Sequence, residues 1–302
     1  MLRSMYTGIS GMRGFQTKLD VVSNNIANVN TFGFKKGRFT FSDLMSQTMQ
    51  GATGPIQGAD GPILGGRNPM QVGLGVAAST IDTIHTQGNR QTTNRPLDIA
   101  IEGDGMFVVA QKIATAGNID FINLETDDVS FTRAGNFYLD DDGYIVTASG
   151  QYLVGAIDHN GDDEFDVAGR ILIPENAESF SVGGDGSVNY VLDGQSYTAG
   201  YIHLAKFSNP EGLEKVGNNM FKLTNNAGVV TEAGGVFNDI NDIYQPGQNG
   251  VGGLYAGALE MSNVDLAEEF TEMIVSQRGF QANTRVITTS DEILQELVNL
   301  KR

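Results

Sequence analysis

Apolar residues recur every seven positions along the first thirty residues of the chain. One row consists of Met5, Met12, Leu19 and Ile26, a second consists of Phe15, Val22 and Val29, and Leu2 and Ile9 extend the pattern toward the N-terminus. A sustained seven-residue apolar repeat is typical of a helix that packs lengthwise against another helix. The pattern therefore predicts a helix over residues 1–30 that requires a helical partner.

A second heptad pattern near the C-terminus supplies a candidate partner. Within residues 262–302 the apolar row is Leu266, Met273, Phe280, Ile287 and Leu294, with Phe270 beside it. Ser262 is predicted to cap the N-terminus of this helix, three residues before Asp265. Acidic residues crowd the first turns and the last two residues are basic, which suits the helix dipole. We expect the two terminal segments to form a coiled-coil-like helical domain.

Such a helix pair leaves apolar side chains uncovered. An ordinary two-helix cap on a globular domain is one interpretation. The other is a pair of helices that completes its packing only among copies of the chain. This second interpretation predicts an assembly interface consisting of Leu2, Met5, Ile9, Met12, Phe15, Leu19, Val22, Ile26, Val29, Leu266, Phe270, Met273, Phe280, Ile287 and Leu294.

The segment after the first helix is poor in core-forming residues. Residues 51–75 are rich in Gly and contain Pro55, Pro62 and Pro69, so we predict a Gly/Pro-rich linker over residues 31–75. Residues 73–78 match the G-x-G-x-x-A pattern of a dinucleotide-binding turn, with Asp98 at about the expected distance. No buried strand precedes the pattern and no helical pattern follows it, so a nucleotide site is not expected.

Between residues 76 and 258 the apolar period changes from seven to two. Leu97, Ile99 and Ile101 alternate with polar neighbours, and Asp142-Gly143 and Asp193-Gly194 separate short apolar runs as hairpin turns do. The pattern predicts a central antiparallel all-β domain, a sandwich or a distorted barrel. The predicted fold class is therefore modular α+β, with terminal helices and a β-rich middle.

Composition restricts the possible functions. The chain has 302 residues, no Cys and a formal net charge of −17, so disulfides and thiolate chemistry are excluded, and no nucleic-acid or membrane partner is expected. No apolar run approaches the ~20 residues of a membrane span, and no cleavable signal peptide is expected. Phe32–Arg38 combines aromatic and basic residues, and docking against an acidic neighbour is the preferred interpretation.

Catalytic, cofactor and metal sites are not predicted. The three His residues lie far apart, and no hydrolase, zinc or phosphate-loop motif is present. Residues 158–166 resemble a calcium loop but lack its central Gly and closing Glu. We therefore predict a small solvated acidic loop at residues 156–166, with a calcium-binding module or an enzyme as remote alternatives.

Both ends and the centre of the chain resemble the bacterial flagellar axial proteins, which form the rod and hook. Gly33-Phe34-Lys35 follows the N-terminal part of the motif, and residues 97–105 and 131–137 match in the middle. The motif residues are Asn25, Ile26, Asn28, Asn30, Ser262, Asn263, Gln277, Arg278 and Asn283. The resemblance runs along the whole chain.

Within this family, residues 265–270 and 278–285 look like those of hook subunits. The resemblance implies a structural subunit of the flagellar hook, a flexible joint that transmits torque from rod to filament. A distal rod subunit is the alternative, because the chain is short for a hook protein and shows no large insert between about 150 and 200.

The resemblance also implies partners and a location. The terminal helices would form the inner tube of a helical homopolymer and the β domain its outer shell. Rod, hook-cap and hook–filament junction proteins would be neighbours, and the flagellar type III apparatus would export the chain. The expected location is extracellular, in the hook or basal body of a bacterial flagellum.

Overall fold

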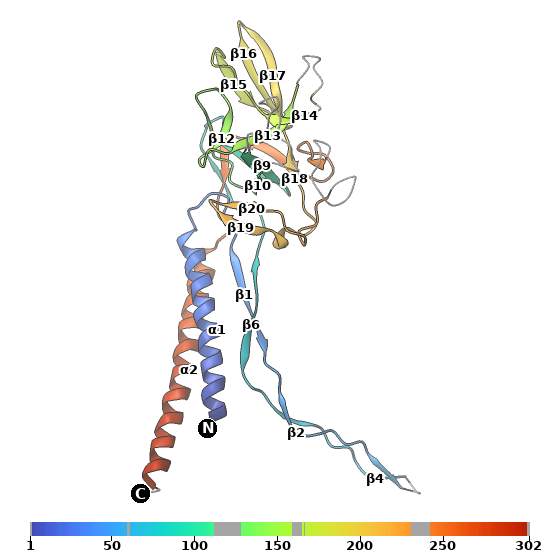
Figure 1. Ribbon diagram of the computed structural model, residues 1–302, viewed down its shortest axis with the longest axis vertical. Coiled ribbons are helices and arrows are strands. Elements are labelled where there is room, and N and C mark those ends of the chain that lie inside the picture. The colour runs from blue at the N-terminus through green and yellow to red at the C-terminus, as the bar shows by residue number, and fades with distance from the viewer. Residues whose placement is uncertain are drawn as a thin grey trace. The chain divides into compact units, whose positions relative to one another are not determined.

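The computed structural model describes residues 2–58, 61–111, 128–158, 165, 167–230 and 242–300, without the side chains of Leu2 and residues 56–64. It divides into two compact units (Figure 1). The first contains residues 1–27, 37–83 and 265–302, and the second contains residues 28–36 and 84–264. Terminal helices and a large antiparallel sheet confirm the predicted α+β fold class.

The first unit contains an antiparallel pair of helices, α1 (Leu2–Ala27) and α2 (Leu266–Leu300) (Figure 1). The Oγ atoms of Ser4 and Ser290 lie 3.3 Å apart, and Lys18 forms an ion pair of 2.5 Å with Glu272. The predicted pairing of the two terminal segments is confirmed.

The cap of α2 differs from the prediction. Asp265, not Ser262, accepts hydrogen bonds at the helix N-terminus, from the amides of Ala267 (2.8 Å) and Glu268 (3.5 Å). The Ser262 hydroxyl instead accepts from the amide of Val264, at 3.3 Å. Ser262 cannot cap the helix because the chain remains non-helical until Leu266.

Strands occupy nearly half of the segment that the sequence assigned to a linker. They pair as a two-stranded ribbon, here called the arm: β1 (Gly37–Asp43) with β6 (Val76–Thr83), β2 (Gln47–Gln50) with β5 (Met70–Val72), and β3 (Ile56–Gly58) with β4 (Gly61–Leu64). Antiparallel pairing bonds the inward-pointing backbone N–H and C=O groups of the ribbon, and water can bond the outward-pointing ones, so few core-forming residues are needed. Residues 76–83, expected in the β-rich domain, therefore belong to the arm.

The second unit is β-rich. Its strands are β7 (Arg90–Thr92), β8 (Ile99–Glu102), β9 (Met106–Gln111), β10 (Asp128–Thr132), β11 (Phe137–Leu139), β12 (Ile145–Thr147), β13 (Tyr152–Ile157), β14 (Val167–Arg170), β15 (Ser179–Val182), β16 (Ser187–Leu192), β17 (Gln195–Ile202), β18 (Leu204–Ala205), β19 (Glu214–Gly217), β20 (Met220–Lys222), β21 (Gly253–Ala256) and β22 (Ala258–Glu260), with a 3₁₀ turn at Pro210–Gly212. The main sheet has the order β15-β16-β17-β13-β9-β10-β20-β19. Both predicted hairpin turns are present, with positive φ at Gly143 and Gly194.

Strand β9 runs through the middle of this sheet and is buried on both faces. Phe107 and Val109 contribute to one apolar cluster, while Met106, Val108 and Ala110 contribute to another. Successive side chains of a strand point to opposite faces, so each face of the sheet has its own core.

Candidate assembly interface

Small residues allow close approach of α1 and α2. A side-chain carbon added at Gly11 would lie 2.8 Å from the Asn283 amide oxygen, and one at Gly279 would lie 2.6 Å from the Phe15 ring. Ser276 is fully buried. The helices therefore pack through small residues that an analysis of large apolar positions does not detect.

The predicted interface residues separate into groups. Val22 is buried, and Ile287 packs against Gly8. The Met12 sulfur accepts a hydrogen bond of 3.4 Å from the Thr284 hydroxyl. Leu266, Phe270 and Phe280 are exposed. The partly buried members are Met5, Ile9, Met12, Phe15, Leu19, Ile26, Val29, Met273, Ile287 and Leu294, and the side chain of Leu2 lies outside the described part.

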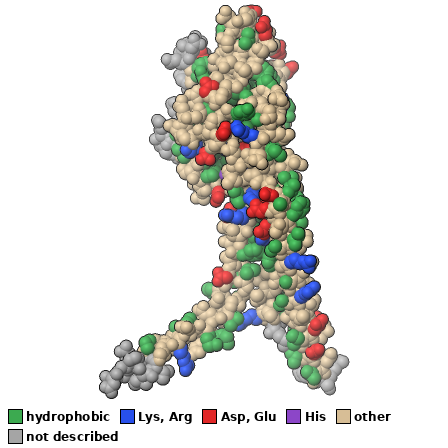
Figure 2. All heavy atoms as spheres, turned by 180° about the vertical axis from the view of Figure 1, so that it is seen from behind, with side chains coloured by type: hydrophobic (Ala, Val, Ile, Leu, Met, Phe, Trp, Pro, Cys, Tyr) green, Lys and Arg blue, Asp and Glu red, His purple; other side chains and the backbone are tan. Residues whose placement is uncertain are grey.

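Two outward apolar rows flank the strip of α2 that faces α1. With about 100° between successive residues, positions four or seven apart share a side of the helix. Leu266, Phe270 and Ile274 form the first row, on one side of that strip. Val286, Ile293 and Leu297 form the second, on the other side, and are 44–49% exposed. Figure 2 shows hydrophobic and charged side chains side by side on the surface.

A groove of about 450 Å³ runs between α1 and the arm within the first unit. We call it the helix–arm groove. Its lining residues are Tyr6, Ile9, Ser10, Arg13, Gly14, Thr17, Leu44, Leu74, Val76, Ala77 and Ala78. The Thr7 hydroxyl donates to the Leu74 carbonyl at 3.4 Å, and the Val76 amide donates to the Ser10 hydroxyl at 3.4 Å. These bonds hold the arm to the helix beside the groove.

The side chain of Asn25 joins three elements of the first unit. Its Oδ1 accepts from the Gly37 amide at 2.9 Å, and its Nδ2 donates to the Gly37 carbonyl at 2.8 Å and to Glu269 Oε2 at 3.1 Å. Asn25 and Glu269 are almost fully buried. Asn25 therefore ties the end of α1 to the start of β1 and the first turn of α2.

Asn263 has the corresponding position in the second unit. The chain passes between the units at residues 27–28, 36–37, 83–84 and 264–265. Asn263 Oδ1 accepts from the Lys36 amide at 2.8 Å, and Nδ2 donates to the Ile84 carbonyl at 2.8 Å and to Thr86 Oγ1 at 3.0 Å. The Asn263 side chain thereby binds the chain next to two of these passages, at 36–37 and 83–84, and Asn263 itself lies beside a third, at 264–265.

Glu260 is the centre of a buried ionic cluster in the second unit. Its side chain is 1% exposed and accepts from Lys35 Nζ and Arg133 Nε, both at 2.7 Å, and from the Gly88 amide at 2.9 Å. Burial raises the pKa of Glu260, but Arg133 and Lys35 outweigh it and hold the pKa below its usual range. The cluster unites the segment after α1, the segment before α2 and the sheet.

His85 lies near the same cations. Both ring nitrogens are buried without a hydrogen-bond partner among the described residues, and the ring centroid lies 5.4 Å from that of Phe221. Burial, together with Lys35, Lys215 and Arg133, lowers the pKa of His85 to about 4. The folded protein therefore holds this imidazole neutral.

We expect acid to destabilise the second unit through His85. Between pH 6.5 and about 4 the unfolded chain binds a proton that the folded chain does not. The free energy of unfolding therefore decreases as the pH is lowered through this window. The loss is on the order of 3 kcal/mol. Urea unfolding between pH 7.5 and 4.5 measures it, and His85→Phe should flatten the dependence. An unchanged pH profile in that variant would contradict this assignment.

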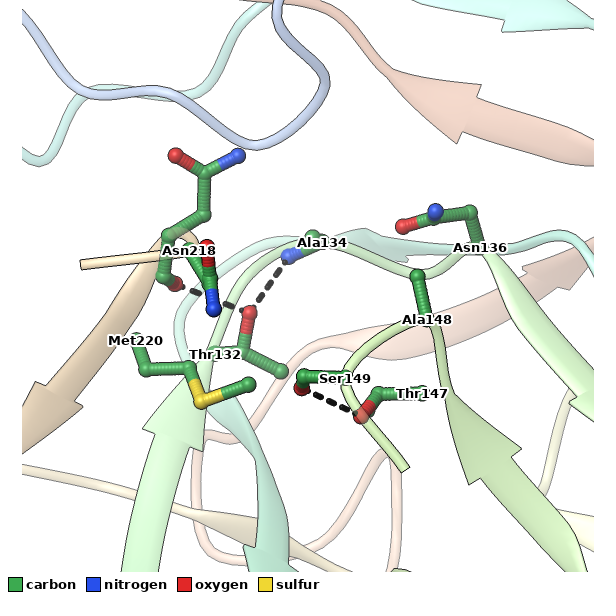
Figure 3. Close-up of a pocket in the computed structure, with 9 residues that line it drawn as sticks. Thr132, Ala134, Asn136, Thr147, Ala148, Ser149, Asn218 and Met220 are labelled. Carbon is green, nitrogen blue, oxygen red and sulfur yellow. Dashed lines mark hydrogen bonds between the residues drawn. The ribbon is translucent and has the colours of Figure 1, made fainter. Parts of the chain in front are cut away.

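A pocket of about 290 Å³ lies in the second unit, and Figure 3 shows its lining. Thr132 donates to the Asn219 carbonyl at 2.9 Å, and the hydroxyls of Thr147 and Ser149 are 3.0 Å apart. The lining contains amides, hydroxyls and methyl groups but no charged side chain. General acid–base catalysis needs a titratable side chain, and the residues that line this pocket include none. The absence of catalysis remains a prediction.

Other predicted features have the following places. Asn28 accepts from the Thr31 hydroxyl at 3.2 Å at the end of α1, and Asn283 donates to the Gly279 carbonyl at 2.9 Å. Ile26 is partly buried, while Asn30, Gln277 and Arg278 are exposed.

Most of the acidic loop at 156–166 lies outside the described residues. Elsewhere in the described chain no cluster of His, Asp and Glu suited to a metal occurs, and neither helix could cross a membrane.

Family models match both ends and the centre of the chain. Residues 5–35 match the model described as flagella basal body rod protein, residues 100–190 the flagellar hook protein FlgE/F/G D1 domain, and residues 255–300 the flagellar basal body rod FlgEFG protein C-terminal. The three matched ranges contain most of α1, part of the β-rich unit and all of α2.

Curated relatives match over the full length. The chain is 50% identical to flagellar basal-body rod protein FlgG of Bacillus subtilis, covering 100% of both chains. It is 37% identical to FlgG of Caulobacter vibrioides, over 99% of this chain and 100% of that one, and 30% identical to hook protein FlgE of Borreliella burgdorferi, over 100% of both. The chain belongs to the flagellar rod and hook protein family. Family members are named as parts of the flagellar basal body or hook, which agrees with the predicted resemblance.

Proposed function

We propose that the protein is a distal rod subunit of a bacterial flagellum. The main support is the full-length relation to a protein named FlgG, whose alignment spans 303 positions against 302 residues here. The alignment with the Borreliella hook protein spans 471 positions, so that relative carries a long additional segment. These observations favour the distal-rod alternative over the hook prediction.

The structural basis of the proposed role is self-association of the first unit. The two outward rows of α2 lie on different sides of the helix, so one flat contact with a single partner leaves a row exposed. Burying either row against another copy removes apolar surface from water, which stabilises the contact by about 25 cal/mol for each Å² buried. Contacts on two sides allow each copy to bind more than one neighbour. The proposed neighbours are further copies, other rod and hook proteins, and the export apparatus during secretion.

Phe270→Asp tests the assembly role. Its side chain is 49% exposed, so the isolated chain tolerates the carboxylate, whereas burial of an unpaired charge between copies costs several kcal/mol. We expect no filaments by electron microscopy and unchanged melting of the β-rich unit. Tyr197→Asp is the matched control, because Tyr197 has a similar exposure, 48%, but lies on β17 of the β-rich unit. This variant should assemble normally.

Complementation distinguishes the rod from the hook. The gene should restore motility to a Bacillus subtilis strain that lacks FlgG and not to one that lacks its hook protein. Filaments of the purified protein should be straight. Rescue of only the hook-deficient strain, or curved filaments, would support the hook prediction instead.

A further inference from the structure

Helix α2 extends beyond its partner within the chain. It has 35 residues, whereas α1 has 26, and the Ser4–Ser290 contact lies near the start of α1. In this register Leu2 lies beside about residue 292, so the last turns of α2, residues 291–300, reach and then pass the N-terminal end of α1 (Figure 1). We call this segment the overhang. At 1.5 Å per residue it is about 15 Å long.

The overhang carries an exposed apolar row. Ile293, Leu297 and Leu300 are 49%, 47% and 82% exposed. They are spaced by four and three residues and so lie on one side of the helix. A helix with such a row is stabilised mainly by packing against another element.

The helix–arm groove is a mainly apolar surface on the same chain. Its lining combines the small residues Gly14, Ala77 and Ala78 with Leu44 and Leu74, each of which is more than a third exposed. A row of aliphatic side chains fits over small residues, as in the packing of helix ridges into grooves.

The charges of the two surfaces are also complementary. Arg13 is the charged residue of the groove lining, and no ion pair joins it to an acid among the described residues. The overhang contains Asp291, Glu292 and Glu296, and no basic residue occurs between 286 and 300. Glu296 is three residues after Ile293 and four before Leu300, so it lies beside the apolar row.

We propose that the overhang of one copy docks in the helix–arm groove of a second copy, with Glu296 against Arg13. Helix α2 is continuous to Leu300, so the overhang cannot fold back into the groove of its own chain. The two surfaces differ, so the contact is heterologous, the type that builds an open filament when its rotation does not close a ring. This proposal rests on the proposed self-assembly and names one contact within it.

A charge exchange tests this contact in the full-length protein. Arg13→Glu alone and Glu296→Arg alone place like charges together, and each should raise the protein concentration for half-maximal polymerisation about tenfold. The double variant restores an opposite pair and should return within about twofold of the wild type. Light scattering and electron microscopy measure polymerisation, and melting of the β-rich unit verifies folding.

Asp291→Arg is the matched control. It makes the same charge change in the same overhang, but Asp291 lies about 160° around the helix from Ile293 and about 140° from Glu296. It should change polymerisation less than twofold and should not rescue Arg13→Glu. Normal polymerisation of both single variants, or failure of the double variant to recover, would overturn the contact and indicate another occupant of the groove. Failure of the wild type to polymerise would instead refute the proposed function.

Discussion

Glu260→Gln is expected to lower the free energy of unfolding of the β-rich unit by about 3–5 kcal/mol. The amide keeps the shape of the carboxylate but leaves Lys35 and Arg133, which are 1% and 6% exposed, without a counter-charge. Removing one partner of a buried ion cluster costs more than the cluster contributes when intact, because the remaining charges stay desolvated. Urea unfolding followed by circular dichroism measures the loss.

Glu102→Gln provides the control for Glu260. Glu102 pairs with Arg90 at 3.0 Å, and the two side chains are 62% and 39% exposed. A solvent-exposed pair contributes about 0–1 kcal/mol, so this variant should remain close to the wild type. Equal losses in the two variants would mean that the buried cluster does not stabilise the unit as proposed.

Gly279→Leu is expected to prevent close packing of α1 and α2 and so to abolish assembly. The new side chain would meet the Phe15 ring, which cannot move aside freely because its centroid lies 5.3 Å from that of Phe41. Overpacking of this kind costs about 1–3 kcal/mol per copy, and the cost recurs in every subunit of a polymer. Sedimentation and electron microscopy measure the loss of filaments.

A size exchange separates packing from helix propensity. Leu favours a helix over Gly by roughly 1 kcal/mol, so α2 itself should not lose helix content. Phe15→Ala makes room for Leu at position 279, and the double variant should recover part of the assembly. Normal filaments of Gly279→Leu alone would show that the helices do not pack closely at this position in the assembly.

The arm illustrates why a local pattern can mislead. Gly and Pro in residues 51–75 are typical of a linker, yet β1 and β6 pair from Gly37–Thr83 to Asp43–Val76. Residues some forty positions apart form these pairs, and nothing in a short window of sequence records their register. The neighbouring helix contributes as well, since Gly14 of α1 packs closely against the Phe41 ring.

The side-chain amides of the family motif also have roles that the sequence alone does not reveal. Asn25 and Asn263 were identified by resemblance, but their roles depend on groups at Gly37, Glu269, Lys36 and Ile84 that the fold brings together. A buried Asn in a helix is unfavourable by propensity alone. Such a residue becomes intelligible only when its partners are known.

The sequence by itself determined the two terminal helices, the β-rich middle and the α+β class, because each follows from apolar period and turn residues close together in the chain. The pairing of the helices was predicted from the same heptad repeat at both ends. Only the tertiary structure decided that small residues bring α1 and α2 together, that α2 overhangs α1, and that Glu260 binds Lys35 and Arg133, which lie 225 and 127 residues away. Periodicity reports which side of an element is apolar. Register and long-range charge pairing depend on how the elements fold together, and no local pattern contains that information.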